Sequence, residues 1–393
     1  MKHHIQLSPS LIALFVVCAL AVVSLLYVPL PILPQLVQTY RLSPSMAGYA
    51  LGSFGIAYAL GFLVFGPLSD RIGRKKVMVA GLLGLAAASL AFLVIQSPAT
   101  FLVGRALQGF VAASFPPVAL AYLAERGTPK QRVWGVAWMS TAFLSAGLLG
   151  QIYGGVVADR WGFGLALLPM VAIYLITALR IWAAPDEEAR VRPSAPIWTS
   201  YRPLGHLLGN AQLQRVYGTA FLLLMCFVAF YIHLDAHFGL ALQQAGIDRL
   251  VAREIALPAF LMPLVVASLI PRWGAHRIAS MGLVVTAGGL ALAASTGETQ
   301  LSLLMAASVV FVAGIGISVP ALIARIAGLT EASTRGLAVA LYTFLLFVGA
   351  SLGPWIAQRA TLLSGSTFFA LLAGLMGMAA LFSMSARRQA ATT

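Results

Sequence analysis

The sequence predicts an all-α integral membrane protein, with twelve transmembrane helices in two six-helix bundles related by a pseudo-twofold axis along the membrane normal. Three observations predict it: the composition, the regular recurrence of long apolar segments, and an internal repeat. Of the 393 residues, 60% are hydrophobic and 9% are charged, whereas about 25% of a soluble domain is charged. So few charges could not cover a soluble particle of this size, which sets a soluble protein with a large apolar core aside.

Twelve apolar segments have about the 20 residues that a membrane-spanning helix needs. The segments are 11–33, 46–68, 77–96, 99–124, 133–158, 163–184, 215–238, 252–270, 276–296, 299–328, 333–357 and 364–385. The segment 252–270 is the weakest, because Arg253, Glu254, Pro258 and Pro263 interrupt it. The first segment predicts a retained helix and not a signal peptide, because it is long and lacks a clean small-residue cleavage site.

The two halves of the chain repeat. Three residues of the first half recur with an offset of 203 positions, as the pairs Pro117 and Pro320, Arg132 and Arg335, and Gly150 and Gly353. The segments 71–73 and 272–274 correspond with an offset of 201 positions. A duplicated unit in one orientation is typical of parallel repeats, which can rock against each other about a central site and so give alternating access.

The domain organisation follows from the one long polar stretch, 185–214. We expect an N-terminal bundle over 1–184, a cytoplasmic linker over 185–214 and a C-terminal bundle over 215–393. The helical pattern from Leu204 to Gln214 suits either a helix along the membrane face or a plain linker.

The net charge of +14 invites a nucleic-acid partner, but its distribution indicates membrane topology instead. With the N-terminus inside, nineteen of the 25 lysines and arginines fall on the cytoplasmic side, five on the outer side, and Arg105 within the membrane. This positive-inside bias predicts that both termini are cytoplasmic. The short termini and compact loops suit a bacterial inner membrane.

The loop between the second and third segments, residues 66–76, has the sequence Gly-Pro-Leu-Ser-Asp-Arg-Ile-Gly-Arg-Lys-Lys. Asp70 ends a helix where a negative charge opposes the helix dipole, so it needs a partner. The start of the eleventh helix, with Ser333 and Thr334 as possible N-caps, offers a positive dipole end. Gly73 permits the tight reversal, and Arg74 can reach Glu125.

Three motifs of the first half carry a family resemblance. The loop resembles the helix 2–3 signature of the major facilitator superfamily. The stretch 105–109, Arg-Ala-Leu-Gln-Gly, is similar to that family's R-x-x-Q-G pattern. The stretch 147–155 resembles the glycine-rich motif of the drug:proton antiporter branch, except that Gln151 stands where a proline is usual.

The resemblance implies a conformational latch, meaning a set of contacts that holds the two halves together on the cytoplasmic side when the protein faces outward. Its residues would be Gly66, Asp70, Arg71, Gly73, Arg74 and Glu125. The alternative is that the basic cluster only anchors topology. In the second half Pro271 takes the place of Asp70, so the acidic residue of the latch is expected only in the first half.

Arg105 lies inside a helix, where a buried cation is costly and a functional role is the default. We expect it to tune a proton site or to contact substrate, with Gln108 one turn away on the same face. The alternative is an arginine bonded to carbonyl groups of the first helix.

Glycines predict close helix packing in the fifth segment. Gly150 and Gly154 form a small-xxx-small pair, with Gly147 and Gly155 beside them, and this stretch is the expected packing hinge. The resemblance implies a tight seam between the halves that prevents leak.

Proton coupling needs a titratable group that both sides can reach in turn. Of the eleven acids, nine fall at helix ends or in loops, which leaves Asp235 in the seventh span and Glu254 in the eighth, both toward the outer side. His233 and His237 share one helix face beside Asp235, which suits a pH-sensitive cluster; solvated residues at the outer mouth are the alternative. Because Asp235 points about 200° away from His233 on a helix, we expect no metal site.

A substrate cavity could be lined by polar and aromatic residues with few charges, which suits an amphipathic or weakly polar substrate. The candidates are Tyr27, Gln35, Tyr58, Gln108, Trp138, Tyr231 and Tyr342, with Tyr122 also considered. The expected partners are a small-molecule substrate, protons and the lipid bilayer, with no nucleic acid and no cofactor, and the expected state is a monomer.

The leading hypothesis is a secondary active transporter that exports drugs or small amphipathic metabolites in exchange for protons. A proton-coupled importer of a sugar or organic acid stays open. An integral-membrane enzyme is the remote alternative, because the chain has no paired carboxylates, no His-Glu-x-x-His pattern and no nucleophile motif.

Overall fold

The computed structural model describes residues 7–185, 201–247, 249–296, 300–331, 334–360 and 362–390. The contacts divide the chain into two compact units. Unit 1 comprises residues 1–204 and 339–344, and unit 2 comprises residues 205–338 and 345–393. The division after Leu204 lies within the stretch expected as a linker, of which residues 186–200 lie outside the described part.

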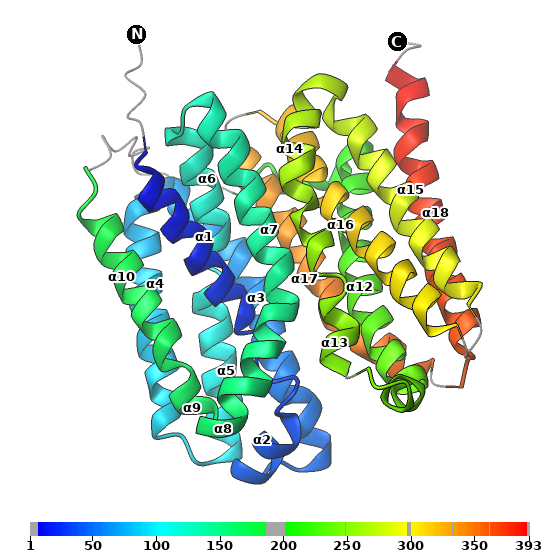
Figure 1. Ribbon diagram of the computed structural model, residues 1–393. Helices are drawn as coiled ribbons and strands as arrows, with labels where there is room; N and C mark the ends of the chain where they lie inside the picture. Colours follow the sequence, from blue (N-terminus) through cyan, green and yellow to red (C-terminus); the bar gives the residue numbers. More distant parts are fainter. Residues whose placement is uncertain are drawn as a thin grey trace. The chain divides into compact units, whose positions relative to one another are not determined.

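Unit 1 is built from helices alone in its described residues (Figure 1). Its helices are α1 (Pro9–Ser24), α2 (Leu33–Thr39), α3 (Pro44–Ile72), α4 (Arg74–Leu90), η1 (Ala91–Leu93), α5 (Pro98–Ala112), α6 (Pro116–Arg126), α7 (Pro129–Tyr153), η2 (Gly154–Ala158), α8 (Asp159–Trp161), α9 (Phe163–Ala166) and α10 (Leu168–Trp182). Inside the unit α1 packs on α7 and α10, α3 packs on α5, and α4 packs on α10.

Unit 2 is likewise helical where it is described. Its helices are α11 (Leu204–Gly209), α12 (Ala211–Gln244), α13 (Arg249–Glu254), η4 (Leu257–Leu261), α14 (Met262–Trp273), α15 (Ala275–Ala294), α16 (Leu301–Leu329), α17 (Arg335–Arg359) and α18 (Gly365–Ala390). Residues 339–344 of α17 are the part of this helix that is grouped with unit 1. Inside this unit α15 packs on α16 and α18, and α12 packs on α16 and α18.

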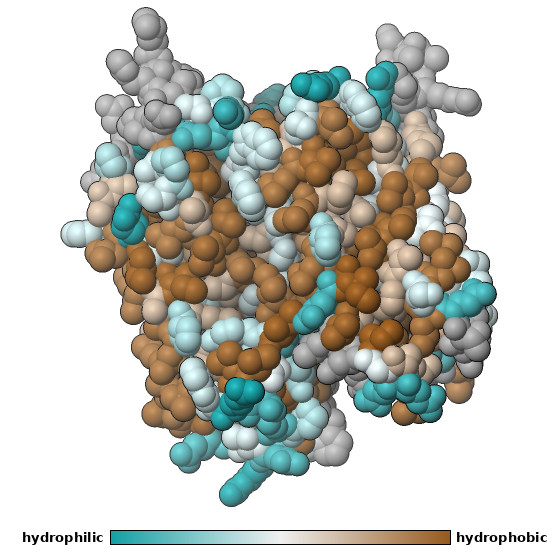
Figure 2. Space-filling model, viewed as in Figure 1, coloured by the Kyte–Doolittle hydropathy of each residue, from teal (hydrophilic) through white to brown (hydrophobic). Residues whose placement is uncertain are grey.

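The apolar helices match the predicted spans. Ten helical stretches of the described residues are long and apolar enough to cross a membrane, and two shorter apolar stretches, Pro9–Ser24 and Leu257–Trp273, bring the set to the expected twelve. Hydrophobic side chains cover most of the middle of the visible helices, and hydrophilic side chains gather toward their ends (Figure 2). The prediction of an all-α membrane protein is confirmed.

The first and fourth predicted spans differ from the structure, and prolines explain both differences. We expected a helix over 11–33, but α1 ends at Ser24 and the chain continues in turns to α2. Prolines at 29 and 31 cannot donate the N–H groups that would extend the helix. The span expected at 99–124 is interrupted between α5 and α6, where Pro116 and Pro117 begin the new helix.

The fifth span contains a π-helical turn. Thr128 and Gln131 form a capping box that starts α7 at Pro129. The helix remains α-helical to Tyr153 and then widens over Gly154–Ala158, where the N–H of Asp159 donates to the carbonyl oxygen of Gly154. Such turns inside helices are rare and are often found at functional sites.

The repeat seen in the sequence has matching backbone geometry in the two units. Gly73 joins α3 to α4 with φ of 103° and ψ of 137°, and Gly274 joins α14 to α15 with φ of 82° and ψ of 145°. These angles lie where side chains other than glycine are strained. The glycines shared at an offset of 201 are therefore explained by the same tight reversal.

The repeated arginines Arg132 and Arg335 make the same kind of hydrogen bond in both units. Arg132 Nε donates to the carbonyl oxygen of Gly127 at 2.7 Å, and Arg335 Nη2 donates to that of Ala327 at 3.2 Å. In each unit an arginine at the start of one helix thus supplies a donor to carbonyl groups at the end of the preceding helix, which lack partners within it.

Candidate functional site

The loop after α3 forms an ion-pair cluster centred on Arg74. Its Nη2 lies 2.7 Å from Asp70 Oδ1 and 2.6 Å from Glu125 Oε1, and its Nε donates to Glu125 Oε2 at 2.8 Å. The Arg74 side chain is only 11% exposed, whereas those of Asp70 and Glu125 are 39% and 56% exposed. The predicted reach from Arg74 to Glu125 is present, as a two-point contact that suits a planar guanidinium.

Residues around this cluster fix the loop. Ser69 Oγ donates to the carbonyl oxygen of Gly66 at 2.7 Å and accepts from Arg74 Nη1 at 3.0 Å. Lys75 Nζ donates to the carbonyl oxygen of Ala184 at 2.6 Å, which ties the loop to the end of α10. Arg71 is half-exposed. Further along, the hydroxyl of Tyr201 donates to the carbonyl oxygen of Leu63 at 2.9 Å, and burial raises the pKa of this hydroxyl, so it remains a donor at neutral pH.

The N-cap expected for the eleventh span is only partly as predicted. Thr334 is the N-cap residue of α17, but its side chain makes no capping bond to the helix. Its hydroxyl donates instead to the carbonyl oxygen of Glu331 at 3.4 Å. Ser333, the other candidate, lies outside the described residues.

The corresponding end of unit 2 has a different network. Arg325 of α16 is 8% exposed, and its Nη1 donates to Ser383 Oγ of α18 at 3.2 Å. Ser383 Oγ in turn lies 3.0 Å from Ser280 Oγ of α15. Three helices are thus joined by a guanidinium and two hydroxyls, where unit 1 uses a guanidinium and two carboxylates.

Arg105 is fully buried in unit 1. Its Nη1 donates to Gln108 Oε1 at 2.7 Å, and Gln108 Nε2 donates to Ser89 Oγ on α4 at 2.9 Å. The guanidinium lies 4.4 Å from the ring centroid of Phe54 on α3, a cation–π distance. Gly109 makes this approach possible, because a Cβ there would collide with the backbone of Phe54. The R-x-x-Q-G pattern is therefore a packing unit as well as a polar one.

The remaining contact of Arg105 explains why a cation is tolerated here. Arg105 Nη2 donates to the carbonyl oxygen of Leu25 at 2.9 Å, immediately after α1. In a continuous helix the donor to this oxygen would be the N–H of residue 29, and Pro29 has none. Arg105 therefore replaces a missing helical donor, which agrees with the alternative in which the arginine bonds to carbonyl groups of the first helix.

The glycines of α7 face α1. A Cβ at Gly150 would lie 2.9 Å from the carbonyl oxygen of Ser24, and a Cβ at Gly154 would lie closer still to that of Val28. Both contacts are inside unit 1, so these two glycines pack within one half. The role of the glycine-rich stretch in a seam between the halves stays a prediction. In unit 2, Gly349 and Gly353 of α17 approach the backbone of α12 in the same way.

Gln151 occupies the position where the glycine-rich motif usually has a proline. Its Nε2 donates to the carbonyl oxygen of Gly147, one turn earlier in the same helix. A proline would remove the backbone donor to that oxygen, whereas Gln151 adds a second one. The matching position of unit 2, with the offset of 203, is Pro354 inside α17.

Two histidines stack inside α12 of unit 2. The rings of His233 and His237 lie 4.0 Å apart at 21°, and the other face of His233 stacks on Phe368 of α18 at 4.1 Å. His233 is fully buried, and among the described residues neither of its ring nitrogens has a hydrogen-bond partner. The predicted shared face is present. Asp235 is half-buried on the same helix, and Glu254 ends α13.

The residues proposed to line a cavity lie in different surroundings. Tyr58 is fully buried between Phe54 and Phe62, Tyr231 contacts Phe227 and Phe230, and Gln108 belongs to the Arg105 network. The set is completed by Tyr27 and Tyr342, which are buried, by Trp138, which is exposed, and by Gln35, whose Nε2 donates to Asp159 Oδ1 at 2.6 Å.

Comparison with known proteins identifies the family. The model of the Major Facilitator Superfamily matches residues 12–258, which is more than half of the chain. The chain belongs to the major facilitator superfamily. It is a multi-pass membrane transporter and not an enzyme, as predicted.

Two bacterial proteins resemble this chain over less than half of its length. The Inner membrane transport protein YnfM of Escherichia coli is 33% identical over 184 residues, which cover 47% of this chain and 43% of that protein. The Chloramphenicol resistance protein CraA of Acinetobacter baumannii is 32% identical over 170 residues, 42% of this chain and 37% of that protein. The matched stretch spans about half or less of the length of these curated relatives.

The fold of the superfamily extends over nearly the whole chain. The crystal structure of the human organic anion transporter MFSD10 (TETRAN) superposes with a TM-score of 0.75, covering 96% of this chain and 100% of that one at 18% identity. At this identity the likeness concerns the fold alone.

Sequence reasoning missed several residues that complete the superfamily motifs here. Ser89 completes the Arg105 network, and the hydroxyl of Tyr174 on α10 donates to the carbonyl oxygen of Ala21 in α1 at 3.2 Å. Arg325 was counted only as a cytoplasmic charge. Pro29 was the one available signal, since a proline four residues after Leu25 leaves a carbonyl oxygen that another group must satisfy.

Proposed function

We propose that this transporter exports small amphipathic compounds, drugs among them, in exchange for protons, by alternating access in a bacterial inner membrane. The observation that carries the proposal is the match to a chloramphenicol resistance protein combined with the glycine-rich stretch of α7 packed on α1. The positive-inside charge distribution supports cytoplasmic termini. The transporter works as a monomer in this proposal.

The latch consists of Gly66, Asp70, Arg71, Gly73, Arg74 and Glu125. The cluster supports this role because Arg74 is nearly buried and binds two carboxylates at once. A conformational change could break one of these ion pairs and keep the other. Asp70 shares Arg74 with Glu125, so it can leave the guanidinium without leaving a buried charge unpaired. That arrangement permits Asp70 to serve a second partner in another state of the transport cycle.

Proton coupling uses Arg105, Asp235, Glu254 and His233. His233 is supported most strongly, because its buried ring nitrogens lack partners among the described residues and the acceptor nitrogen of a neutral imidazole can take up a proton. A proton on His233 would place a charge next to His237 and so disfavour the present stack. Arg105 contributes a fixed positive charge close to the end of α1.

The substrate cavity draws on Tyr27, Gln35, Tyr58, Gln108, Trp138, Tyr231 and Tyr342. Tyrosine and tryptophan offer large apolar faces with one polar tip each, which suits amphipathic compounds. Gly147, Gly150, Gly154 and Gly155 let α7 slide against α1 while excluding water from the contact.

Everted membrane vesicles test the direction and the coupling. Respiration acidifies the vesicle lumen, and the quenching of an acridine dye reports the pH difference. Adding chloramphenicol or another compound from a drug panel should relieve the quenching if protons leave as substrate enters. Vesicles without the transporter, and vesicles with the Asp70→Asn variant at equal abundance, are the controls.

The sign of the signal discriminates between the alternatives. Substrate-driven acidification of the lumen would indicate a symporter and overturn the export proposal. No response to any compound, together with no gain of resistance in an efflux-deficient host, would overturn drug export as the function.

A further inference from the structure

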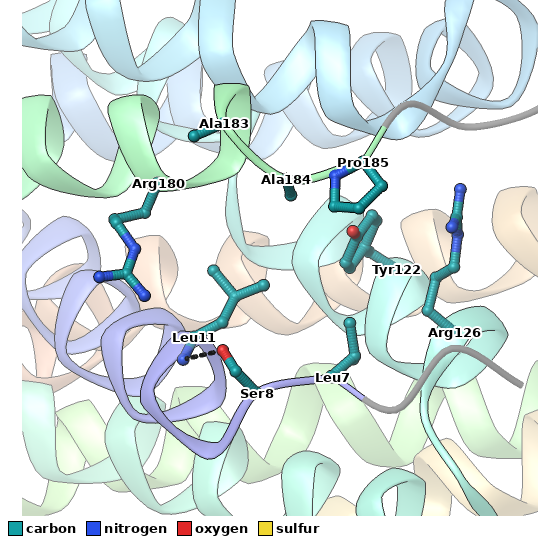
Figure 3. Close-up of a pocket in the computed structure, with 9 residues that line it drawn as sticks. All are labelled: Leu7, Ser8, Leu11, Tyr122, Arg126, Arg180, Ala183, Ala184 and Pro185. Atoms are coloured by element: carbon teal, nitrogen blue, oxygen red, sulfur yellow. Dashed lines mark hydrogen bonds between the residues drawn. The ribbon is translucent and has the colours of Figure 1, made fainter.

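A pocket of about 330 Å³ opens at the end of unit 1 where α1 begins and α6 and α10 end (Figure 3). It is lined by Leu7, Ser8, Leu11, Tyr122, Arg126, Arg180, Ala183, Ala184 and Pro185. The lining combines two guanidinium groups and a phenol with apolar side chains. None of these residues belongs to the latch, the Arg105 network or the histidine pair.

The two arginines of the pocket keep most of their binding capacity. Arg126 lies over the ring of Tyr122 at 5.8 Å, and Arg180 Nη2 donates to Ser10 Oγ at 3.3 Å. Among the described residues neither guanidinium forms a salt bridge. Each guanidinium has five N–H donors, so both can accept an anionic group. Figure 3 shows them on different sides of the apolar residues that lie between them.

The pocket lies at the depth of the membrane surface. The apolar stretch of α6 ends at Arg126 and that of α10 at Trp182. The Trp182 side chain is 67% exposed, and tryptophans are enriched at the boundary between lipid and water. The last turns of α10 also expose Leu175, Ile176 and Leu179, which offers an acyl chain an apolar track leading up to the pocket.

We propose that this pocket binds the headgroup of an anionic phospholipid, with Arg126 and Arg180 flanking the headgroup on two sides and the acyl chains lying along α10. Basic pockets between membrane helices are a recognised chemistry for acidic headgroups. The inference goes beyond the proposed function. It rests on that proposal only in naming the cytoplasmic leaflet as the source of the lipid.

An acidic segment of the chain itself could compete with the lipid for the pocket. Asp186, Glu187 and Glu188 directly follow Pro185, which lines the pocket. Carboxylates could take the place of a lipid phosphate, so the test must separate the two. A soluble phosphate compound is the other source of the same chemistry, and the apolar lining favours the lipid.

The test measures lipid binding to the purified full-length chain in neutral detergent. The protein is titrated with phosphatidylglycerol, phosphatidylcholine or glycerol phosphate, and native mass spectrometry counts the bound molecules. We expect phosphatidylglycerol to bind and phosphatidylcholine not to bind. The R126Q/R180Q variant should lose about tenfold in affinity for phosphatidylglycerol.

A matched control removes two positive charges elsewhere. Lys130 and Arg277 are exposed and do not line the pocket. The K130Q/R277Q variant should stay within about twofold of the wild type, because a specific pocket and not the overall charge determines binding. If both double variants lose the same affinity, or neither loses any, the proposal is wrong.

Further measurements locate the bound lipid and distinguish it from the other possible occupants of the pocket. A photoreactive phosphatidylglycerol should label the segment 175–185 in the unaltered protein, so the test survives if R126Q/R180Q fails to fold. Labelling only elsewhere overturns the proposal. Displacement of the lipid by millimolar glycerol phosphate would indicate a soluble ligand and would overturn the proposal. Binding of phosphatidylglycerol by D186N/E187Q/E188Q but not by the unaltered chain would show that the acidic run fills the pocket, and it would also overturn the proposal.

Discussion

Arg105 of α5 donates from Nη2 to the carbonyl oxygen of Leu25 at 2.9 Å, at the point where Pro29 withholds the donor that a continuing helix would supply. The arginine and the proline are thus two parts of one device. It ends α1 in the interior of unit 1 without leaving a buried carbonyl group unpaired.

Arg105→Gln should lower the free energy of unfolding by about 1–3 kcal/mol, because it removes a charged donor from a buried acceptor. Pro29→Ala restores a backbone N–H at the right position and should reduce that cost in the double variant. Chemical unfolding of the two single variants and the double variant in detergent measures the coupling. Strictly additive effects would contradict the pairing of Arg105 with Pro29.

Gly154→Ala should destabilise the protein more than Gly150→Ala does, because its Cβ would come closer to the carbonyl oxygen of Val28 than a Cβ at Gly150 would come to that of Ser24. Costs of about 1–3 kcal/mol are typical of forced overpacking. The midpoint of thermal unfolding measures the order of the two effects.

Gly288→Ala is the matched control for these glycines. Gly288 lies within α15, and a Cβ there would meet nothing within 4 Å. Alanine is favoured over glycine in helices by about 0.8–1.0 kcal/mol, so this variant should be neutral or stabilising. A loss of stability similar to that of Gly154→Ala would contradict the close-approach argument.

Neutralising both carboxylate partners of Arg74 should lower the free energy of unfolding more than neutralising either one. Asp70→Asn or Glu125→Gln alone leaves the guanidinium one carboxylate, and for pairs this exposed each should cost no more than about 1 kcal/mol. The D70N/E125Q variant leaves a nearly buried cation without an ion pair and should lose more than the two single losses combined. Unfolding measurements test the excess, and transport assays should show a larger fall for Asp70→Asn than for Lys130→Gln.

His233→Phe separates packing from proton chemistry. Phenylalanine can keep the stack on Phe368, so the unfolding temperature should change little. If His233 takes part in coupling, the dependence of transport on pH should flatten in the variant, because the ring that exchanges the proton is gone. A transport profile identical to that of the wild type, at normal abundance, would remove His233 from the coupling group.

The sequence predicted the number and order of the spans because each is a long apolar run whose chemistry is local. Arg74 and Glu125 could also be paired, since a known loop and a neighbouring helix end place them together. The partner of Arg105 could not be found in this way. It depends on which backbone group lies across the unit from α5. The apolar pattern of α1 continues past Ser24, so only Pro29 and Pro31 indicate that the helix ends early.

For the glycine-rich stretch, too, one feature could be predicted from the sequence and another could not. Its spacing predicted close packing, and the structure has close packing. The helix on which it packs was not predicted, because small residues on one face indicate how closely a neighbouring helix can approach but not which helix that is. The pocket beside Arg126 and Arg180 had no signal at all, since its walls come from three segments far apart in the chain.

The π-helical turn at Gly154–Ala158 sets the direction in which Asp159 points. Each residue of an α-helix advances the chain by about 100° around its axis, and a π-helical turn carries one residue more than an α-helical one. In the orientation that this turn gives it, the Asp159 carboxylate accepts a hydrogen bond from Gln35 Nε2. Deleting one residue from the turn would restore a regular helix and swing Asp159 more than a quarter of a revolution away from Gln35, while the contact of Gly150 with Ser24 earlier in α7 stayed in place. A single codon lost or gained here would therefore re-aim one end of the helix and leave its packing on α1 intact.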